Sequence, residues 1–155
     1  MRVAAVLVLL FLPVHAAAAP DTDVEVPATV PAVKSLEPTA EARFNEGQAL
    51  ARRNDWVGAT AAYHAATRLR PAFAEAWNGL GYALRKQRRF DESVSAYREA
   101  LRLRPNYPQA LEYLGEAYVE LGRLAEARAV LERLRRLDPY EADELAQAIA
   151  KAAKR

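Results

Sequence analysis

The sequence predicts an all-α fold, an α-solenoid of three helix-turn-helix repeats followed by a C-terminal capping helix. Residues that favour helices, namely Ala, Leu, Arg and Glu, dominate the 155-residue chain. Residues also recur at one fixed interval, shown by two columns: Gly47, Gly81 and Gly115, and Pro71, Pro105 and Pro139. A period of about 20 to 50 residues indicates stacked repeats that bury one another's apolar faces.

Residues 1–18 have the three-part pattern of a secretory signal peptide, with Arg2, an apolar run over residues 3–14 and small residues before the cleavage point. The apolar run is too short to span a bilayer, which takes about 20 residues. We therefore expect cleavage near Ala18 and a periplasmic or secreted protein. Residues 19–38 hold four of the nine prolines. We expect a disordered linker there, because closely spaced prolines block a packed helix.

Residues 39–155 are expected to form the folded domain. Apolar residues recur there at the three- and four-residue spacing of helices, in two helical stretches per repeat. A proline ends each repeat, because the residue before a proline is disfavoured in the helical region. The expected repeats are 40–73, 74–107 and 108–141, and the expected capping helix is 139–153.

Small residues mark where the two helices of each repeat should approach each other. In the second repeat, Gly81 is expected to form a notch in one helix and Ser93 a low point on the other. Large side chains such as Trp77, and the column that contains Tyr63 and Tyr97, are expected to interlock around these small residues.

The expected capping helix has a clear start and one apolar face. Asp138 is a favoured N-cap residue, and Pro139 suits the first helical position. Ala142, Leu145 and Ile149 recur at helical spacing and would cover the exposed side of the last repeat. Its removal is expected to lower solubility and melting temperature.

These columns resemble a known repeat family. The order Trp77, Leu80, Gly81, a small residue early in the second helix, Tyr97, Ala100 and Pro105 resembles the tetratricopeptide repeat, whose period is about 34 residues. The third repeat resembles it nearly as well. The first repeat departs from it, because Arg43 and Glu46 stand where large apolar residues are expected. A polar face suits a terminal repeat, over which nothing stacks.

The resemblance implies a right-handed superhelix whose concave face is lined by the first helix of each repeat and holds a peptide or helix of a partner protein. Chaperone-binding members of the family hold a terminal carboxylate with Lys, Asn and Arg. That clamp is absent here, and the groove is expected to be basic in the first two repeats and acidic in the third. The groove residues that the resemblance implies are Phe44, Gln48, Arg52, Asn78, Tyr82, Arg85, Lys86, Glu112, Tyr113, Glu116 and Glu120.

Composition and spacing argue against other kinds of site. The chain has no Cys and two His, which excludes disulfides and thiolate or His-rich metal sites. His64 has no acidic or histidine partner at helical spacing and is interpreted as structural. Glu112 and Glu116, one turn apart, are interpreted as charged surface. No catalytic residue, cofactor or metal is predicted.

Nucleotide and nucleic-acid binding are also not predicted. Gly79 and Gly81 lack the third glycine of a dinucleotide fingerprint and no strand precedes them. Basic and acidic residues are nearly balanced, 22 against 20, and most arginines fall in last helical turns, where cations complement the helix dipole. Gly79 has no counterpart in the other repeats. We expect it either to lower the groove floor for a bulky ligand group or to loosen its helix, and in the second case Gly79→Ala would stabilise the protein.

The function that the sequence favours is that of an exported, non-catalytic protein-interaction module, an adaptor in envelope assembly or secretion. The alternative is a structural module that self-associates weakly, as a homo-oligomer, by stacking its terminal repeats end to end. An enzyme has no supporting set of residues.

Overall fold

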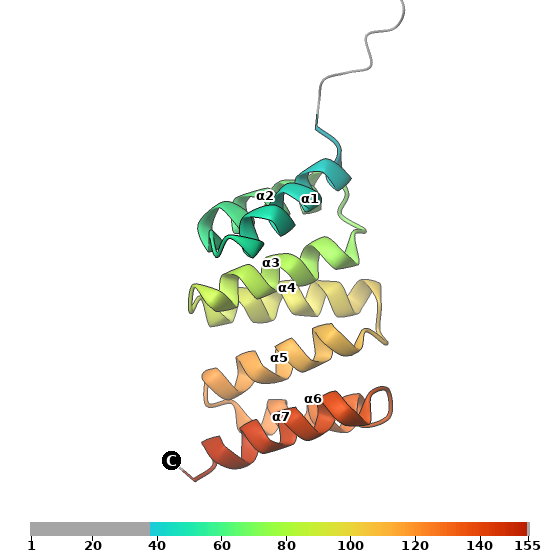
Figure 1. Ribbon diagram of the computed structural model, residues 1–155. Coiled ribbons are helices and arrows are strands. Elements are labelled where there is room, and N and C mark those ends of the chain that lie inside the picture. Colours follow the sequence, from blue (N-terminus) through green and yellow to red (C-terminus); the bar gives the residue numbers. More distant parts are fainter. Residues whose placement is uncertain (1–37, 155) are drawn as a thin grey trace, which may run out of the picture. The chain divides into compact units, whose positions relative to one another are not determined.

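The computed structural model describes residues 38–154, which form seven helices and no strand (Figure 1). The predicted all-α repeat solenoid is confirmed. The expected signal peptide and all but the last residue of the expected linker lie outside the described residues. None of the described helices is long and apolar enough to cross a membrane. The helices are α1 (Ala40–Arg52), α2 (Trp56–Leu69), α3 (Ala74–Lys86), α4 (Phe90–Leu103), α5 (Pro108–Glu120), α6 (Leu124–Leu134) and α7 (Pro139–Ala152).

The helices pack in consecutive pairs. The pairs α1–α2, α3–α4 and α5–α6 are the three repeats, and each of α2 and α4 also contacts the first helix of the next repeat. The first helices contact one another in the order α1, α3, α5, and α7 extends this row by packing on α5 and α6 (Figure 1). A continuous row of first helices therefore forms one side of the solenoid.

The turn inside each repeat is built the same way. Asn54, Arg88 and Gly122 occupy equivalent positions in the three repeats, and all three have positive φ, at 59°, 62° and 70°. The amide of the next residue in each case donates to a carbonyl five residues earlier, at 2.8–3.0 Å, as in the Schellman motif that ends helices. Only the third turn uses glycine, the residue that adopts this conformation without strain.

We expect Arg88→Gly to stabilise the protein modestly. The left-handed conformation costs an L-residue roughly 1–2 kcal/mol, and the added freedom of glycine in the unfolded chain offsets roughly half of the gain. The net rise in the free energy of unfolding should be about 0.5–1 kcal/mol, measured by urea denaturation. Gly122→Ala is the reverse test and should lower that free energy by about 1 kcal/mol. A Gly122→Ala variant as stable as wild type would contradict the assignment.

The glycine notches hold large side chains. Tyr97 of α4 is fully buried against Gly81, and an added Cβ there would lie 2.6 Å from its Cε1 atom. Tyr63 of α2 packs against Gly47 of its own repeat, as predicted from the repeat columns. The third notch differs, because the atoms nearest to Gly115 belong to Leu145 of α7. The capping helix thus fills the place that a tyrosine takes in the first two repeats.

Gly79 is also a packing residue, which the sequence interpretation missed. An added Cβ on Gly79 would lie 2.8 Å from Cε1 of Tyr63. The ring of Tyr63 therefore lies between glycines of two successive repeats, Gly47 and Gly79. This contact opposes the expectation that Gly79→Ala would stabilise a merely loosened helix.

Polar contacts complete the packing. Trp77, the large residue of the second repeat, donates its indole N–H to the carbonyl of Pro71 at 2.9 Å and so ties two repeats together. Ser93 is fully buried and donates its hydroxyl to the carbonyl of Phe90 at 2.8 Å. The polar residues of the first repeat, Arg43 and Glu46, form an exposed ion pair at 2.8 Å on α1.

Candidate functional site

A hollow of about 480 Å³ lies across the row of first helices, with walls from α1, α3 and α5. We call it the aromatic groove. Gly79 and Ala51 provide parts of its lining that have little or no side chain, which leaves room between the larger residues. Five of the predicted groove residues line it: Phe44, Gln48, Asn78, Tyr82 and Tyr113.

Five of the eleven residues that line the groove are aromatic: Phe44, Tyr63, Tyr82, Tyr107 and Tyr113. The ring centres of Tyr82 and Tyr113, one from each of α3 and α5, are 5.2 Å apart. Trp56 meets Tyr82 edge-on, with 5.7 Å between centres. At the α1 end, Phe44 lies 5.7 Å from Tyr63. Such rings offer large apolar surface at low conformational cost, which suits recognition of an apolar side chain.

Asn78 places a hydrogen-bond acceptor without a partner in this groove. The residue is 6% exposed, and its Nδ2 donates to Oε1 of Gln109 at 3.1 Å. Its Oδ1 is buried and has no hydrogen-bond partner among the described residues. A buried unpaired acceptor costs about 1–3 kcal/mol, so a donor supplied to Oδ1 would recover free energy.

The basic residues of the second repeat lie over the rings. The Arg85 guanidinium is 5.6 Å from the ring centre of Tyr82 and 5.3 Å from that of Tyr113. It also forms an ion pair with Glu116 of α5 at 2.7 Å. The Lys86 ammonium lies 5.5 Å from the ring of Trp56. Glu116 of the acidic third repeat therefore offsets the Arg85 charge, whereas Lys86 of the same helix forms no ion pair among the described residues.

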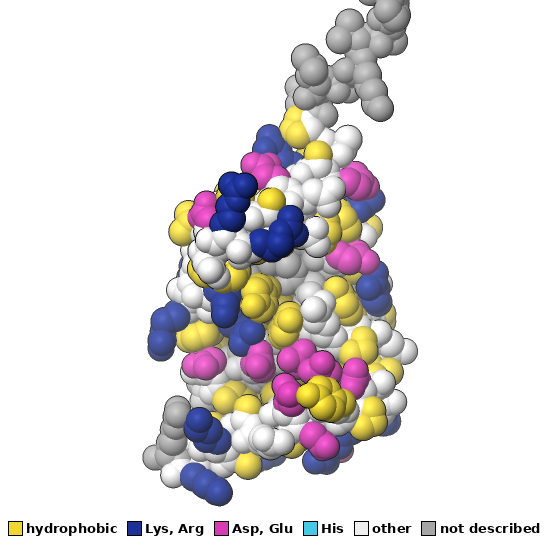
Figure 2. Space-filling view, viewed as in Figure 1, with side chains coloured by type: hydrophobic (Ala, Val, Ile, Leu, Met, Phe, Trp, Pro, Cys, Tyr) yellow, Lys and Arg dark blue, Asp and Glu magenta, His cyan; other side chains and the backbone are white. Residues whose placement is uncertain are grey.

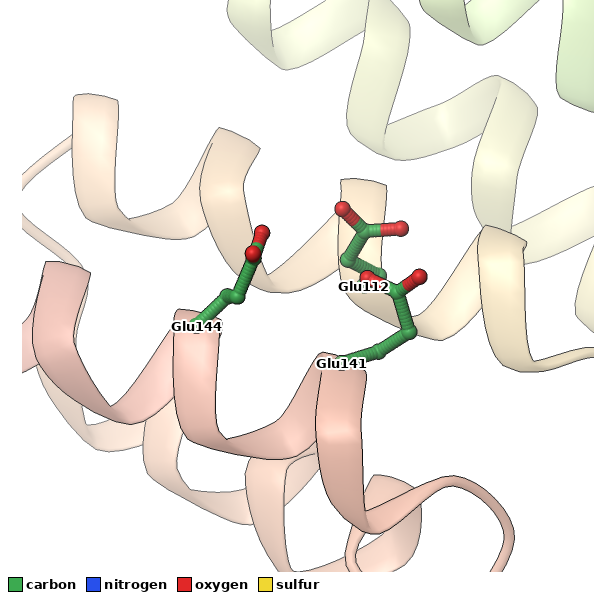
Figure 3. A group of neighbouring side chains, drawn as sticks. All are labelled: Glu112, Glu141 and Glu144. Atoms are coloured by element: carbon green, nitrogen blue, oxygen red, sulfur yellow. The ribbon is translucent and has the colours of Figure 1, made fainter.

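A second hollow, of about 540 Å³, adjoins the first and shares Tyr107, Gln109 and Tyr113 with it. We call it the acidic pocket. Three of its four acidic residues are glutamates, Glu112 from α5 and Glu141 and Glu144 from α7, and their carboxylates lie near one another (Figure 3). One oxygen of each of these glutamates lies within 4.8 Å of the others. The fourth acidic residue is Asp138, the N-cap residue of α7. Acidic side chains gather over α5 and the first part of α7 on this face, whereas basic side chains lie over α1, at the level of α3 and near the C-terminal end of α7 (Figure 2).

The electrostatics of the acidic pocket centre on Glu112. Burial, together with the nearby charges of Glu141 and Glu116, raises the pKa of Glu112 to about 7, against the lowering effect of Arg85. Five of the predicted groove residues line neither hollow: Arg85, Lys86 and Glu116, described above, and the exposed Arg52 and Glu120.

The fold and the repeat columns can be compared with those of known proteins. The tetratricopeptide repeat family matches residues 44–108 and 82–142, which together span more than half of the chain. The chain belongs to the tetratricopeptide repeat family. A search of curated proteins finds no match.

Solved tetratricopeptide repeat structures share the fold. One is the TPR2B domain of yeast Sti1, solved as a pHsp70 complex. Its sequence is 26% identical to this chain, the match spans 74% of this chain and 96% of the Sti1 chain, and the TM-score is 0.69. The first repeat domain of Spaghetti (RPAP3) bound to the HSP90 peptide SRMEEVD is 22% identical, with coverages of 76% and 94% and a TM-score of 0.71. The Arabidopsis OM64 domain is 22% identical, with coverages of 73% and 95% and a TM-score of 0.70.

The array also has a larger hollow, of about 740 Å³, between the second helices α2 and α4. Its floor is apolar, formed by Trp77, Leu80 and Leu84 of α3. His64 is exposed on its wall. The sequence interpretation missed this hollow, the ring of Trp56, and the two α7 carboxylates of the acidic pocket.

We expect Glu112→Gln to stabilise this tetratricopeptide array above neutral pH. Because the folded-state pKa of Glu112, about 7, exceeds its ordinary value of 4.5, the folded protein binds more protons between these values. Wild-type stability should therefore fall as pH rises through that window, and the glutamine variant should lack this fall. After allowance for solvent screening, the gain should be on the order of 1 kcal/mol. Urea unfolding across the window measures it, and parallel wild-type and variant curves would contradict it.

Proposed function

We propose that this chain is a non-catalytic protein-interaction module that binds a peptide or helical segment of a partner protein in the aromatic groove. The observation that carries the proposal is the buried Oδ1 of Asn78, which has no donor among the described residues although it lies among aromatic side chains. A peptide in extended form presents a backbone N–H at each non-proline residue and so supplies the missing donor. Its apolar side chains would contact Tyr82 and Tyr113.

The relatives support this proposal. The Sti1 and RPAP3 domains are described in complexes with pHsp70 and with an HSP90 peptide, respectively. Both domains align with most of the described repeats of this chain. This chain therefore has the same row of first helices. A partner protein is therefore the ligand class that the fold favours.

The proposal includes a cellular setting. The signal-peptide pattern of residues 1–18 supports export, and an exported interaction module without catalytic groups would serve as an adaptor in envelope assembly or secretion. A fusion of residues 1–38 to alkaline phosphatase should be active in a bacterial host, because this enzyme needs the periplasm to form its disulfides. An inactive fusion with normal expression would overturn the export part alone.

Site-specific photo-cross-linking in cells tests the groove. A benzophenone amino acid at Gln48, exposed in the groove, should give a discrete adduct with a partner protein. The same probe at Arg128, exposed on α6, is the matched control and should not give that adduct. Tyr82→Ala should reduce the Gln48 adduct by removing a central ring of the groove. Identical adducts from both positions, or a yield unaffected by Tyr82→Ala, would overturn the proposal.

A further inference from the structure

We propose that the acidic pocket selects a lysine or arginine side chain of the peptide bound in the aromatic groove, so that the ligand is a basic segment with an apolar residue nearby. This inference rests on the proposed function and specifies the chemistry of its ligand. It concerns the pocket formed by Glu112, Glu141 and Glu144.

The three carboxylates differ from most others in the domain. Eight of the twelve glutamates among residues 38–154 form ion pairs with arginines. Glu112, Glu141 and Glu144 form none within the described part of the chain, although one oxygen of each lies within 4.8 Å of the others. Three like charges at this separation repel one another, and a cation placed between them would relieve the repulsion.

The pocket is continuous with the groove. Tyr107, Gln109 and Tyr113 line both hollows, and Gln109 accepts the hydrogen bond from Asn78 at 3.1 Å. The unpaired Oδ1 of Asn78, buried in the groove, is an independent sign that a ligand donor belongs next to this boundary. A peptide held there by its backbone would direct a neighbouring side chain into the acidic pocket.

The chemistry of the walls fits an organic cation. Tyr107, Tyr113 and Tyr140 line the pocket together with the carboxylates, and Tyr140 is 72% exposed at its mouth. Aromatic faces attract ammonium and guanidinium groups, and carboxylates form charge-assisted hydrogen bonds with both. The peptide SRMEEVD bound by the RPAP3 domain carries three acidic residues. It also carries one arginine. The charge of this pocket would repel the acidic residues of such a sequence and favour basic ones.

The pH dependence of binding should follow from the same groups. Glu112 of α5 faces Glu116 of its own helix, Arg85 of α3, and Glu141 and Glu144 of α7. Burial and the neighbouring carboxylates raise its pKa to about 7. A basic peptide should therefore bind more tightly above neutrality, where Glu112 is ionised, than in mildly acidic buffer, where it is protonated.

The test uses a phage library of random peptides, each about a dozen residues long, selected on the full chain. Selected sequences should place Lys or Arg close to an aromatic or aliphatic residue. Binding of the corresponding synthetic peptides should weaken by about tenfold or more in the variant Glu112→Gln/Glu144→Gln, as expected for lost charge-assisted hydrogen bonds. Asp143→Asn, an exposed acid of α7 outside the pocket, is the matched control and should leave binding unchanged.

The outcomes separate this inference from the proposed function. Peptides that need Tyr82 but carry no basic residue would overturn the inference and leave the groove assignment intact. A selection that yields no peptide dependent on Tyr82 would overturn both. The pocket's oxygen ligands also suit a divalent metal ion. If Ca²⁺ or Mg²⁺ alone raises the melting temperature of the wild type but not of Glu112→Gln/Glu144→Gln, the pocket is a metal site and the inference falls.

Discussion

Gly81→Leu is expected to disrupt the second repeat, and even Gly81→Ala should lower the melting temperature of the protein. The first added atom would stand 2.6 Å from Cε1 of Tyr97, a ring that is 0% exposed and enclosed by neighbouring helices. Overpacking a closed core typically costs about 1–3 kcal/mol. The higher helix propensity of alanine offsets about 1 kcal/mol of this destabilisation. Circular dichroism melting of both variants measures the effect, with leucine the more severe.

Gly79→Ala is the matched control for Gly81→Ala. It makes the same chemical change on the same helix, and its Cβ would also approach a tyrosine ring, that of Tyr63 at 2.8 Å. Tyr63, however, borders the aromatic groove and has space into which its ring can shift. We therefore expect a smaller loss for Gly79→Ala than for Gly81→Ala.

A double-mutant cycle isolates the Gly81 contact. Tyr97→Leu places at this position the residue that Leu131 provides in the third repeat, and it should remove most of the additional cost of Gly81→Ala. The two changes should then be strongly non-additive. Additive losses, or a Gly81→Ala variant at least as stable as wild type, would show that Gly81 is not a packing notch.

The repeat columns made the fold predictable, because each column reports one position in a repeating unit. Gly81 could be interpreted from Gly47 and Gly115 without any structure. Gly79 could not, because its partner Tyr63 lies in the preceding repeat and the columns compare equivalent positions only. Contacts between repeats depend on how successive units are rotated, which the period alone does not determine.

The groove residues were predicted through the family resemblance, and that prediction has a similar limit. Phe44, Gln48, Asn78, Tyr82 and Tyr113 do line one hollow, because they occupy equivalent faces of three first helices. Their pairing was not predictable. The ion pair from Arg85 to Glu116 joins two repeats, so the two charges offset each other.

The acidic pocket was missed because α7 was interpreted as purely structural. Its apolar face did explain why the helix is present. Glu141 and Glu144 become part of a site only because the helix continues the row of first helices and faces Glu112. The sequence does place Glu141 and Glu144 at helical spacing beside the buried face of this helix. That spacing indicates a site only once the direction of α7 is known.

Removal of α7 should have the largest effect on stability of any change to this end of the domain. A chain that ends at Leu137 is expected to melt at a much lower temperature than the full chain and to aggregate on concentration. Leu145 and Ile149 of α7 belong to the same core cluster as Leu111 and Leu134 of the last repeat. Without α7, Leu111 and Leu134, with their neighbours, would be left facing water as an apolar patch, which promotes association.

Leu145→Ala tests the same interface without truncation. Leu145 is 1% exposed and fills the notch at Gly115, so its loss should cost about 2–5 kcal/mol. At roughly 4–8 °C per kcal/mol for a domain of about this size, the melting temperature should fall by at least about 8 °C. Gln147→Ala, an exposed change on the same helix, should leave it nearly unchanged. If Leu145→Ala and Gln147→Ala melt together, α7 does not close the core, and the acidic pocket that depends on its position loses its basis as well.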